Sequence, residues 1–164
     1  MDKVAGSTNM LDLLNQALAR ELQVCLQYML QHGIGAGRAS AVTGKGSLDA
    51  QDKFVASHSQ VWLPGATLKK IAVTEMHHAE SITERIVHLG GVPTTQPDAI
   101  TLGQATREML AIDRHEEQGA IELYRQIIDV AAKAHDDETL SLFRGILADE
   151  EKHLRTFSDL LAKE

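Results

Sequence analysis

Two short stretches of this sequence repeat the same pair of metal-binding side chains. Glu75 and His78 are separated by two residues, and Glu150 and His153 repeat that Glu-x-x-His spacing later in the chain. On a helix, residues three apart lie on one face, so each pair can offer a carboxylate and an imidazole to the same ion. One such pair alone is common on solvated helix surfaces. The repeat indicates a metal site only if both pairs face inward.

The apolar residues around the two pairs predict that they do face inward. Glu75 and His78 share a helical stripe with isoleucines, and Glu150 shares one with leucines and a phenylalanine. Two further carboxylates, Glu21 and Glu117, fall on the apolar stripes of two other helical segments. Residues on such a stripe face the core of a helical protein. Four carboxylates and two histidines are therefore expected to converge on one core.

Burial of four carboxylates requires compensating positive charge. An ionised carboxylate without a partner is costly to bury, and the stripes carry no Lys or Arg to neutralise four of them. Two divalent cations would balance these charges with both imidazoles neutral. Di-iron and di-manganese carboxylate bundles have this ligand pattern: one Glu comes from each of two helices, and Glu-x-x-His comes from each of the other two. The alternative is four unrelated glutamates that protonate or extend to solvent.

Composition favours a single all-α domain over residues 1–164. The net charge of −7 argues against a nucleic-acid partner, which requires a basic surface. The chain has no apolar run near the ~18 residues that cross a membrane, and its first residues lack the apolar segment of a signal peptide. We therefore expect a cytoplasmic protein with no membrane partner. Cys25 is the only cysteine, which excludes an intrachain disulfide, and we expect it to be a small buried hydrophobe.

Four amphipathic segments with helix start or stop signals predict an antiparallel four-helix bundle. We expect the first helix from about Thr8 to His32 and the second from Trp62 or Pro64 to Leu89. The third should begin at Thr101, which forms a capping-box pattern with Gln104. The fourth should begin after Asp136 and Asp137, which can cap it. A stop after the second helix is predicted at Gly90 and Gly91.

The connections between these segments constrain the topology. The link from His135 to Asp137 is tight, so the third and fourth helices should be antiparallel neighbours. The stretch from Gly90 to Thr101 could reach about 36 Å when extended, which suits one long crossover along the bundle. An inserted loop at about residues 33–60 joins the first two helices, and residues 47–56 within it could form a short helix.

The motifs resemble those of the bacterioferritins, a di-iron branch of the ferritin-like proteins. In the order of that family's four helices they are Glu21-Leu22 with Gln27-Tyr28, Glu75-Met76-x-His78-Ala79, Glu108-Met109-Leu110 ahead of Glu117, and Asp149-Glu150-Glu151-x-His153. The resemblance implies a ferritin-like bundle with two iron ions per subunit, held by Glu21, Glu75, His78, Glu117, Glu150 and His153. Glu75 and Glu150 match the two carboxylates that bridge the ions.

Two further assignments within the site follow from the same resemblance. Glu116 and Glu117 stand side by side, and Glu117 is chosen because the run from Glu108 to His153 then matches the family's spacing without a gap. Tyr28 matches a tyrosine beside the site that donates a hydrogen bond or an electron. The alternative for Tyr28 is an ordinary core aromatic.

The resemblance also implies a haem shared between two subunits. In bacterioferritins the methionine after the first Glu of Glu-Met-x-His is its axial ligand, and Met76 occupies that position here. Met76 is offset by about 100° around the helix from Glu75, so it is expected to face outward toward a partner subunit. Thioether sulfur is a suitable haem ligand. The alternative is a methionine that only packs at a helix interface.

The implied function is iron storage and detoxification. The di-iron centre would act as a ferroxidase, oxidising Fe(II) to Fe(III) with oxygen or peroxide, and the mineral would collect inside a homo-oligomeric shell built from dimers. The chain departs from the family in its insertion and in ending eleven residues after His153, without a fifth helix. We therefore expect a smaller shell, of about 12 subunits.

Three alternative functions remain open at this point. A rubrerythrin-type di-iron peroxidase or oxidase would store no iron, although the usual electron-transfer cysteines are absent. A Dps-like mini-ferritin would hold iron between subunits, and a metal-free bundle would hold none. The other histidines have no partner at ligand spacing, and we expect surface or interface positions for His32, His58, His77, His88, His115 and His135.

Overall fold

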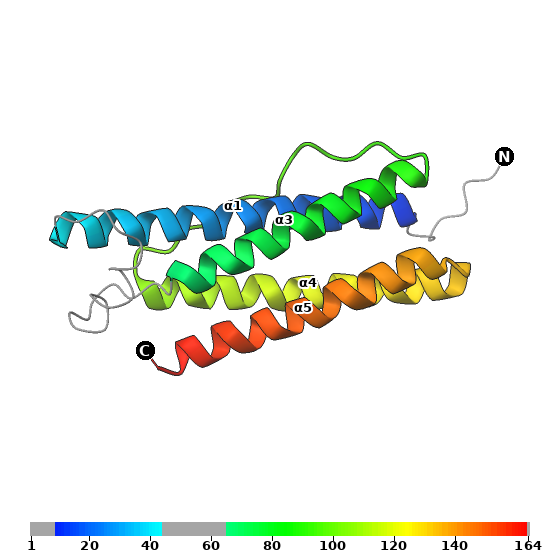
Figure 1. The fold of residues 1–164 in the computed structure, drawn as a ribbon. Helices are drawn as coiled ribbons and strands as arrows, with labels where there is room; N and C mark the ends of the chain where they lie inside the picture. The colour runs from blue at the N-terminus through cyan, green and yellow to red at the C-terminus, as the bar shows by residue number, and fades with distance from the viewer. Residues whose placement is uncertain (1–8, 44–64, 164) are drawn as a thin grey trace.

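The computed structural model describes residues 9–43 and 65–163. Its side chains are described for residues 9–35 and 66–163. Its four helices are α1 (Met10–Thr43), α3 (Gly65–His88), α4 (Thr106–Ala134) and α5 (Asp137–Leu161). Figure 1 shows them side by side with their long axes roughly aligned. No strand occurs in the described ranges. The predicted all-α four-helix bundle is confirmed.

Apolar stripes of all four helices meet in two core clusters toward opposite ends of the bundle. One cluster is centred on fully buried residues such as Leu14, Ile82 and Phe143. The other includes Leu68 and Phe157, which are also fully buried. Each helix contributes to both clusters, so each must pass through the layer between them. That layer is where the sequence places the carboxylates and histidines.

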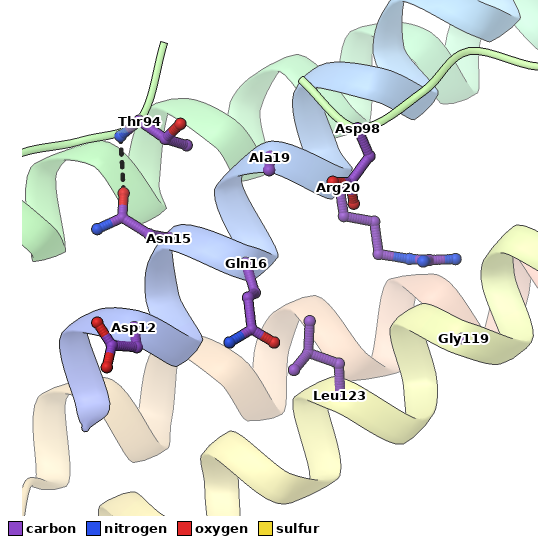
Figure 2. Close-up of a pocket in the computed structure, with 9 residues that line it drawn as sticks. All are labelled: Asp12, Asn15, Gln16, Ala19, Arg20, Thr94, Asp98, Gly119 and Leu123. Atoms are coloured by element: carbon purple, nitrogen blue, oxygen red, sulfur yellow. Dashed lines mark hydrogen bonds between the residues drawn. The ribbon is translucent and has the colours of Figure 1, made fainter. Parts of the chain in front are cut away.

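The crossover after α3 runs along the bundle beside α1, as predicted (Figure 1). The Asn15 side chain holds it in place: its Oδ1 accepts from the Thr94 backbone N–H at 2.7 Å, and its Nδ2 donates to the Val92 carbonyl at 3.2 Å. Figure 2 shows the bond between Asn15 and Thr94 at one side of a pocket between α1, α4 and the crossover. Further along, the Asp98 backbone N–H donates to the Ala19 carbonyl at 3.0 Å.

The predicted end of α3 at the glycine pair is confirmed. Gly90 has a φ of 75°, the left-handed conformation that glycine adopts without steric cost. The Gly90 N–H donates to the Val87 carbonyl and the Gly91 N–H to the Ile86 carbonyl, both at 2.9 Å. These bonds form a Schellman motif, which satisfies the last carbonyls of the helix.

Two predicted helix boundaries are wrong. The first helix does not end at His32 but continues to Thr43, so the expected loop at 33–60 begins as helix. Glycines at 33, 35 and 37 weaken a helix by about 1 kcal/mol each but keep the backbone N–H, and no proline interrupts this stretch. The remainder of the expected insertion, including the short helix at 47–56, lies outside the described residues.

The third helix starts at Thr106 instead of Thr101, so the capping box expected at Thr101 and Gln104 does not form. Ala105 is the N-cap residue and has extended backbone angles. The Glu108 side chain provides the capping contact instead, because its Oε2 accepts from the Gln104 backbone N–H at 2.7 Å. The Thr101 N–H donates to Gln27 Oε1 at 3.3 Å and so belongs to the crossover.

The capping of α5 by Asp136 is confirmed and leads to a stability prediction. Asp136 Oδ1 accepts from the Thr139 backbone N–H at 3.0 Å and from Arg85 Nη2 at 2.7 Å. We expect Asp136→Ala to destabilise the protein by about 1–2 kcal/mol, since it removes an N-cap and leaves the Arg85 guanidinium without this partner. Thermal unfolding at neutral pH measures the loss. Asp137→Ala, which removes an exposed charge in the first turn, is the matched control and should cost less.

The same cap should depend on pH. Burial by itself raises the pKa of Asp136, but hydrogen bonds from Thr139 and Arg85 outweigh it and lower this pKa below its ordinary value. A carboxyl whose pKa is depressed in the folded state stabilises the protein above its unfolded-state pKa, and the stabilisation is lost as pH falls through the folded-state pKa. The difference between the wild type and Asp136→Ala should therefore shrink in acid. An undiminished difference there would contradict the role of the ionised carboxylate.

Candidate metal centre

The layer between the two apolar clusters contains all six predicted ligand residues. Glu21 of α1, Glu75 of α3, Glu117 of α4 and Glu150 of α5 are each at most 1% exposed. His78 and His153 are 7% and 8% exposed. The tertiary structure thus gathers one carboxylate from every helix and an imidazole from α3 and α5, as the apolar stripes predicted.

The six residues form two overlapping groups, each able to surround one ion. Glu21, Glu75, His78 and Glu150 form the first group, and in it one ligand atom from each residue lies within 4.8 Å of the others. Glu75, Glu117, Glu150 and His153 form the second group by the same measure. Glu75 and Glu150 belong to both. This is the arrangement expected of two carboxylates that bridge a pair of ions.

The individual oxygens of the shared carboxylates face different histidines. Oε2 of Glu75 lies 2.9 Å from Nδ1 of His78, whereas its Oε1 lies 2.8 Å from Nδ1 of His153. Glu150 repeats the division, with Oε1 3.0 Å from His78 Nδ1 and Oε2 3.2 Å from His153 Nδ1. Each of the two shared carboxylates therefore presents one oxygen to each group.

Several of these close polar atoms lack hydrogen-bond partners, and this tests whether the residues fit metal ions. Both oxygens of Glu75, Oε2 of Glu21, Oε1 of Glu150 and Nδ1 of His78 are buried without a hydrogen bond. The contacts of His78 Nδ1 with these oxygens are short but do not have hydrogen-bond geometry. A buried polar atom left unpaired costs about 1–3 kcal/mol. Cations placed among these atoms would satisfy them together, so the residues fit a pair of metal ions.

Protonation of the centre reflects the same charge imbalance. Burial raises the pKa of Glu21 to about 8, with a further contribution from the negative charge of Glu150. Burial also raises the pKa of Glu117 well above its ordinary value. Burial alone would lower the pKa of His153, but the adjacent carboxylates of Glu150 and Glu75 raise it to about 9. Protons therefore neutralise part of the negative charge, and metal binding should release them.

Glu21 and Glu117, the two outer carboxylates that each belong to only one group, accept a hydrogen bond from a tyrosine of the facing helix. The Tyr28 hydroxyl donates to Oε1 of Glu117 at 2.6 Å, which places Tyr28 beside the centre as predicted. The Tyr124 hydroxyl donates to Oε1 of Glu21. Sequence analysis did not assign Tyr124 to the site. Its inward position seven residues after Glu117 was the available signal, because a buried tyrosine hydroxyl usually requires a partner.

Glu116 and Glu117 differ in burial and in what they face. Glu117 faces the centre, whereas Glu116 lies on the outer side of α4 and its Oε2 pairs with Nη2 of Arg20 at 2.8 Å. Gly119 leaves room for the guanidinium, because a Cβ there would lie 2.9 Å from Arg20 Nη2. Figure 2 shows the Arg20 side chain extending from α1 toward the Gly119 backbone. The ion pair joins α1 and α4 at the residues that directly precede the candidate ligands Glu21 and Glu117.

The remaining predicted positions are mostly as expected. His77, His88, His115 and His135 are exposed, His32 is partly buried, and His58 lies outside the described residues. Cys25 is also only partly buried, so the prediction of a buried small hydrophobe is wrong. Leu26, the next residue of α1, is likewise partly buried.

Met76 lies on the outside of the bundle, as its helical offset from Glu75 predicted. Its side chain is 47% exposed, and Val73, one turn earlier on α3, is 44% exposed. On α1, Met29 and Leu30 are also exposed. Among the described helices, none is long and apolar enough to cross a membrane.

Comparison with known proteins agrees with this architecture. The family model of the ferritin-like domain matches residues 65–164. A bacterioferritin of Desulfovibrio desulfuricans is 34% identical over 151 residues, which cover 92% of this chain and 73% of that protein. A bacterioferritin of Streptomyces coelicolor is 42% identical over 93 residues, covering 54% of this chain and 56% of that protein. One from Mycolicibacterium paratuberculosis is 30% identical over 154 residues, covering 91% and 81%. The chain belongs to the bacterioferritin family of ferritin-like proteins.

Proposed function

We propose that this protein stores iron and oxidises Fe(II) to Fe(III) at a di-iron centre within each subunit. The observation that carries the proposal is the division of the Glu75 and Glu150 oxygens between His78 and His153, which suits two ions about one carboxylate's width apart. The similarity to bacterioferritins supports iron as the metal. We take residues 1–164 to be one ferritin-like domain that carries this centre.

The ligand set matches the chemistry of iron oxidation. Glu21 and His78 would hold one ion, Glu117 and His153 the other, with Glu75 and Glu150 shared between them. Carboxylates and imidazoles suit iron, and four carboxylates balance two Fe(II) ions. Each of two Fe(II) ions gives up one electron, and oxygen or peroxide accepts the pair.

Tyrosines 28 and 124 would position the outer carboxylates for this chemistry. Each hydroxyl donates to one oxygen of its glutamate and leaves the other oxygen free to bind an ion. Burial raises the pKa of both tyrosines well above the ordinary value, so each hydroxyl keeps its proton. Tyr28 would also be close enough to supply an electron. This second role of Tyr28 rests on the family resemblance.

We further propose that a haem binds between two subunits with Met76 of each as an axial ligand. The exposed thioether of Met76 and the exposed apolar side chains Val73, Met29 and Leu30 fit a large apolar cofactor at a subunit interface. Haem would supply an electron carrier between the exterior and stored ferric iron. The test of this proposal is described in the Discussion.

The competing functions predict different assemblies and iron contents. In a mini-ferritin the ligands would come from two subunits, whereas here all six come from one chain, which disfavours that alternative. A rubrerythrin-type oxidase could use the same centre but would hold no more than the ions bound there. Iron content per subunit therefore separates storage from oxidation alone.

The proposed storage function is tested by loading the protein with Fe(II) in air and measuring mass and iron content on the same sample. We expect a closed homo-oligomeric shell built from dimers, since closed symmetry is the default for such subunits, and far more iron than two ions per subunit. Size-exclusion chromatography with light scattering gives the mass and decides the expectation of about 12 subunits. A bare dimer, or iron that saturates at two ions per subunit, would contradict storage.

A further inference from the structure

A cavity between α3 and α5 opens beside the candidate metal centre. Its volume is about 650 Å³. Its polar lining comes from both helices and includes Thr67, Lys70 and Thr74 of α3 with Lys152, His153 and Thr156 of α5. The cavity therefore joins the outer surface of this helix pair to one of the six candidate ligands.

Both helices present the same two groups to this cavity. Lys70 and Thr74 are four residues apart on α3, and Lys152 and Thr156 are four residues apart on α5, so each helix places an ammonium and a hydroxyl one turn apart. The Lys152 ammonium contacts Asp149 Oδ1 at 2.8 Å. Lys70 forms no ion pair with residues 9–43 or 65–163. Two lysines thus face one aspartate, and the lining carries net positive charge.

His153 forms the inner end of the cavity. It is only 8% exposed, and its Nδ1 faces the metal centre, 2.8 Å from Glu75 Oε1. If Nδ1 binds a metal ion, the neutral imidazole carries its proton on Nε2, the nitrogen on the other side of the ring. That N–H makes no hydrogen bond within the described residues. It is an unpaired donor on a largely buried side chain that lines the cavity.

We propose that this cavity binds inorganic phosphate next to the metal centre. Lysine ammonium groups bind phosphate as point charges, and the His153 N–H adds a donor at the inner end. The hydroxyls of Thr74 and Thr156 donate to their own helix carbonyls at 3.3 and 2.9 Å, so their lone pairs remain free to accept from a protonated phosphate oxygen. Two ammonium groups make the cavity unfavourable for a divalent cation.

The proposal gives the cavity a role that rests on the proposed function. Phosphate oxygens are hard ligands that suit ferric iron. An anion held beside His153 would meet Fe(III) as it leaves the centre and accompany it into the mineral. The site would therefore supply phosphate to the stored ferric mineral. Binding itself, however, requires neither oxidation nor iron.

Calorimetric titration of the iron-free protein with inorganic phosphate at constant ionic strength tests the binding directly. Lys70→Gln should weaken binding about tenfold, the value of one charged hydrogen bond. The matched control is Lys69→Gln, which removes an equally exposed lysine whose side chain does not line the cavity, and which should change the affinity less than about twofold. Equal weakening in both variants, or no binding by the wild type, would overturn the proposal.

Two further measurements keep the interpretation specific. Glycerol 3-phosphate should bind no more tightly than inorganic phosphate, and tighter binding of this monoester would overturn the assignment to the free anion. Fe(II) oxidation is measured separately in phosphate-free buffer. A wild-type protein that binds phosphate but does not oxidise iron would refute the proposed function and leave the phosphate site standing. The reverse result would refute only the phosphate site.

Discussion

Replacing Glu75 by Ala should abolish the rapid oxidation of Fe(II) by this protein. Glu75 contributes one oxygen to each half of the centre, so its loss removes a ligand from both ions and leaves the remaining charges unbalanced. The wild type should oxidise about two Fe(II) per subunit in a fast phase, as expected for a two-metal site. In the variant that phase should slow by more than about 100-fold, beyond the effect typical of residues that only orient ligands. Stopped-flow absorbance after mixing with aerobic Fe(II) measures both phases.

Glu80→Ala provides the matched control for that experiment. Glu80 lies on the same helix, but its side chain is 68% exposed, and within the described residues its one ion pair is with His77. The control should retain the fast phase, because it changes the net charge by the same amount without touching the centre. Glu150→Ala should behave like Glu75→Ala, since Glu150 has the same division of oxygens. A fast phase that persists in Glu75→Ala would show that the ligand assignment is wrong.

Replacing Met76 by Leu should eliminate haem binding while iron oxidation survives. Leucine preserves the apolar volume at this exposed position but removes the thioether sulfur, the only atom of the side chain that can ligate haem iron. Protein purified from haem-replete cells should show a Soret band corresponding to up to about one haem per two subunits, since two Met76 residues would share each haem. The absorption spectrum of Met76→Leu should lack that band.

The control for haem binding is Met29→Leu. Met29 is 52% exposed on α1, so this variant removes a comparable sulfur from another exposed apolar position. It should keep the Soret band. Loss of the band in Met29→Leu but not in Met76→Leu would show that Met76 is not the haem ligand. Oxidation of Fe(II) should be unchanged in Met76→Leu, because the side chain points away from the centre. A wild-type protein that stays colourless after haem addition would refute the haem proposal.

The sequence alone predicted the coarse plan of the fold and the side chains that meet between the two apolar clusters. Helical periodicity placed Glu21, Glu75, Glu117 and Glu150 on inward stripes, and the structure buries all four. Charge balance then indicated that cations belong there. Local signals also predicted the Asp136 cap and the glycine stop of α3, because caps depend on neighbouring residues only.

The family resemblance added details that periodicity does not contain. It selected Glu117 over Glu116 as a ligand, and in the structure Glu117 is buried whereas Glu116 pairs with Arg20. It also named Tyr28, whose hydroxyl contacts Glu117. It implied the haem at Met76 and the closed shell, which remain predictions because both depend on contacts between subunits.

The tertiary structure decided how the helices meet. Periodicity gives the angle of a residue around its own helix, but not the height at which two helices are aligned. The contact between Tyr124 and Glu21, residues far apart in the chain, depends on that alignment. So does the division of the Glu75 and Glu150 oxygens between two histidines, which also requires specific side-chain rotamers. These relations favour a site for two ions more strongly than the ligand types alone do.

Tertiary context also changed two boundaries and revealed the α3–α5 cavity. Glycines suggested an end for α1 near His32, yet helix continues to Thr43, since a glycine weakens a helix without removing its backbone donors. The start of α4 moved to Thr106, where Glu108 rather than Thr101 makes the capping contact. Lys70 and Lys152 belong to different helices, and nothing in the sequence links them. Only the packing of α3 against α5 places both at one cavity beside His153.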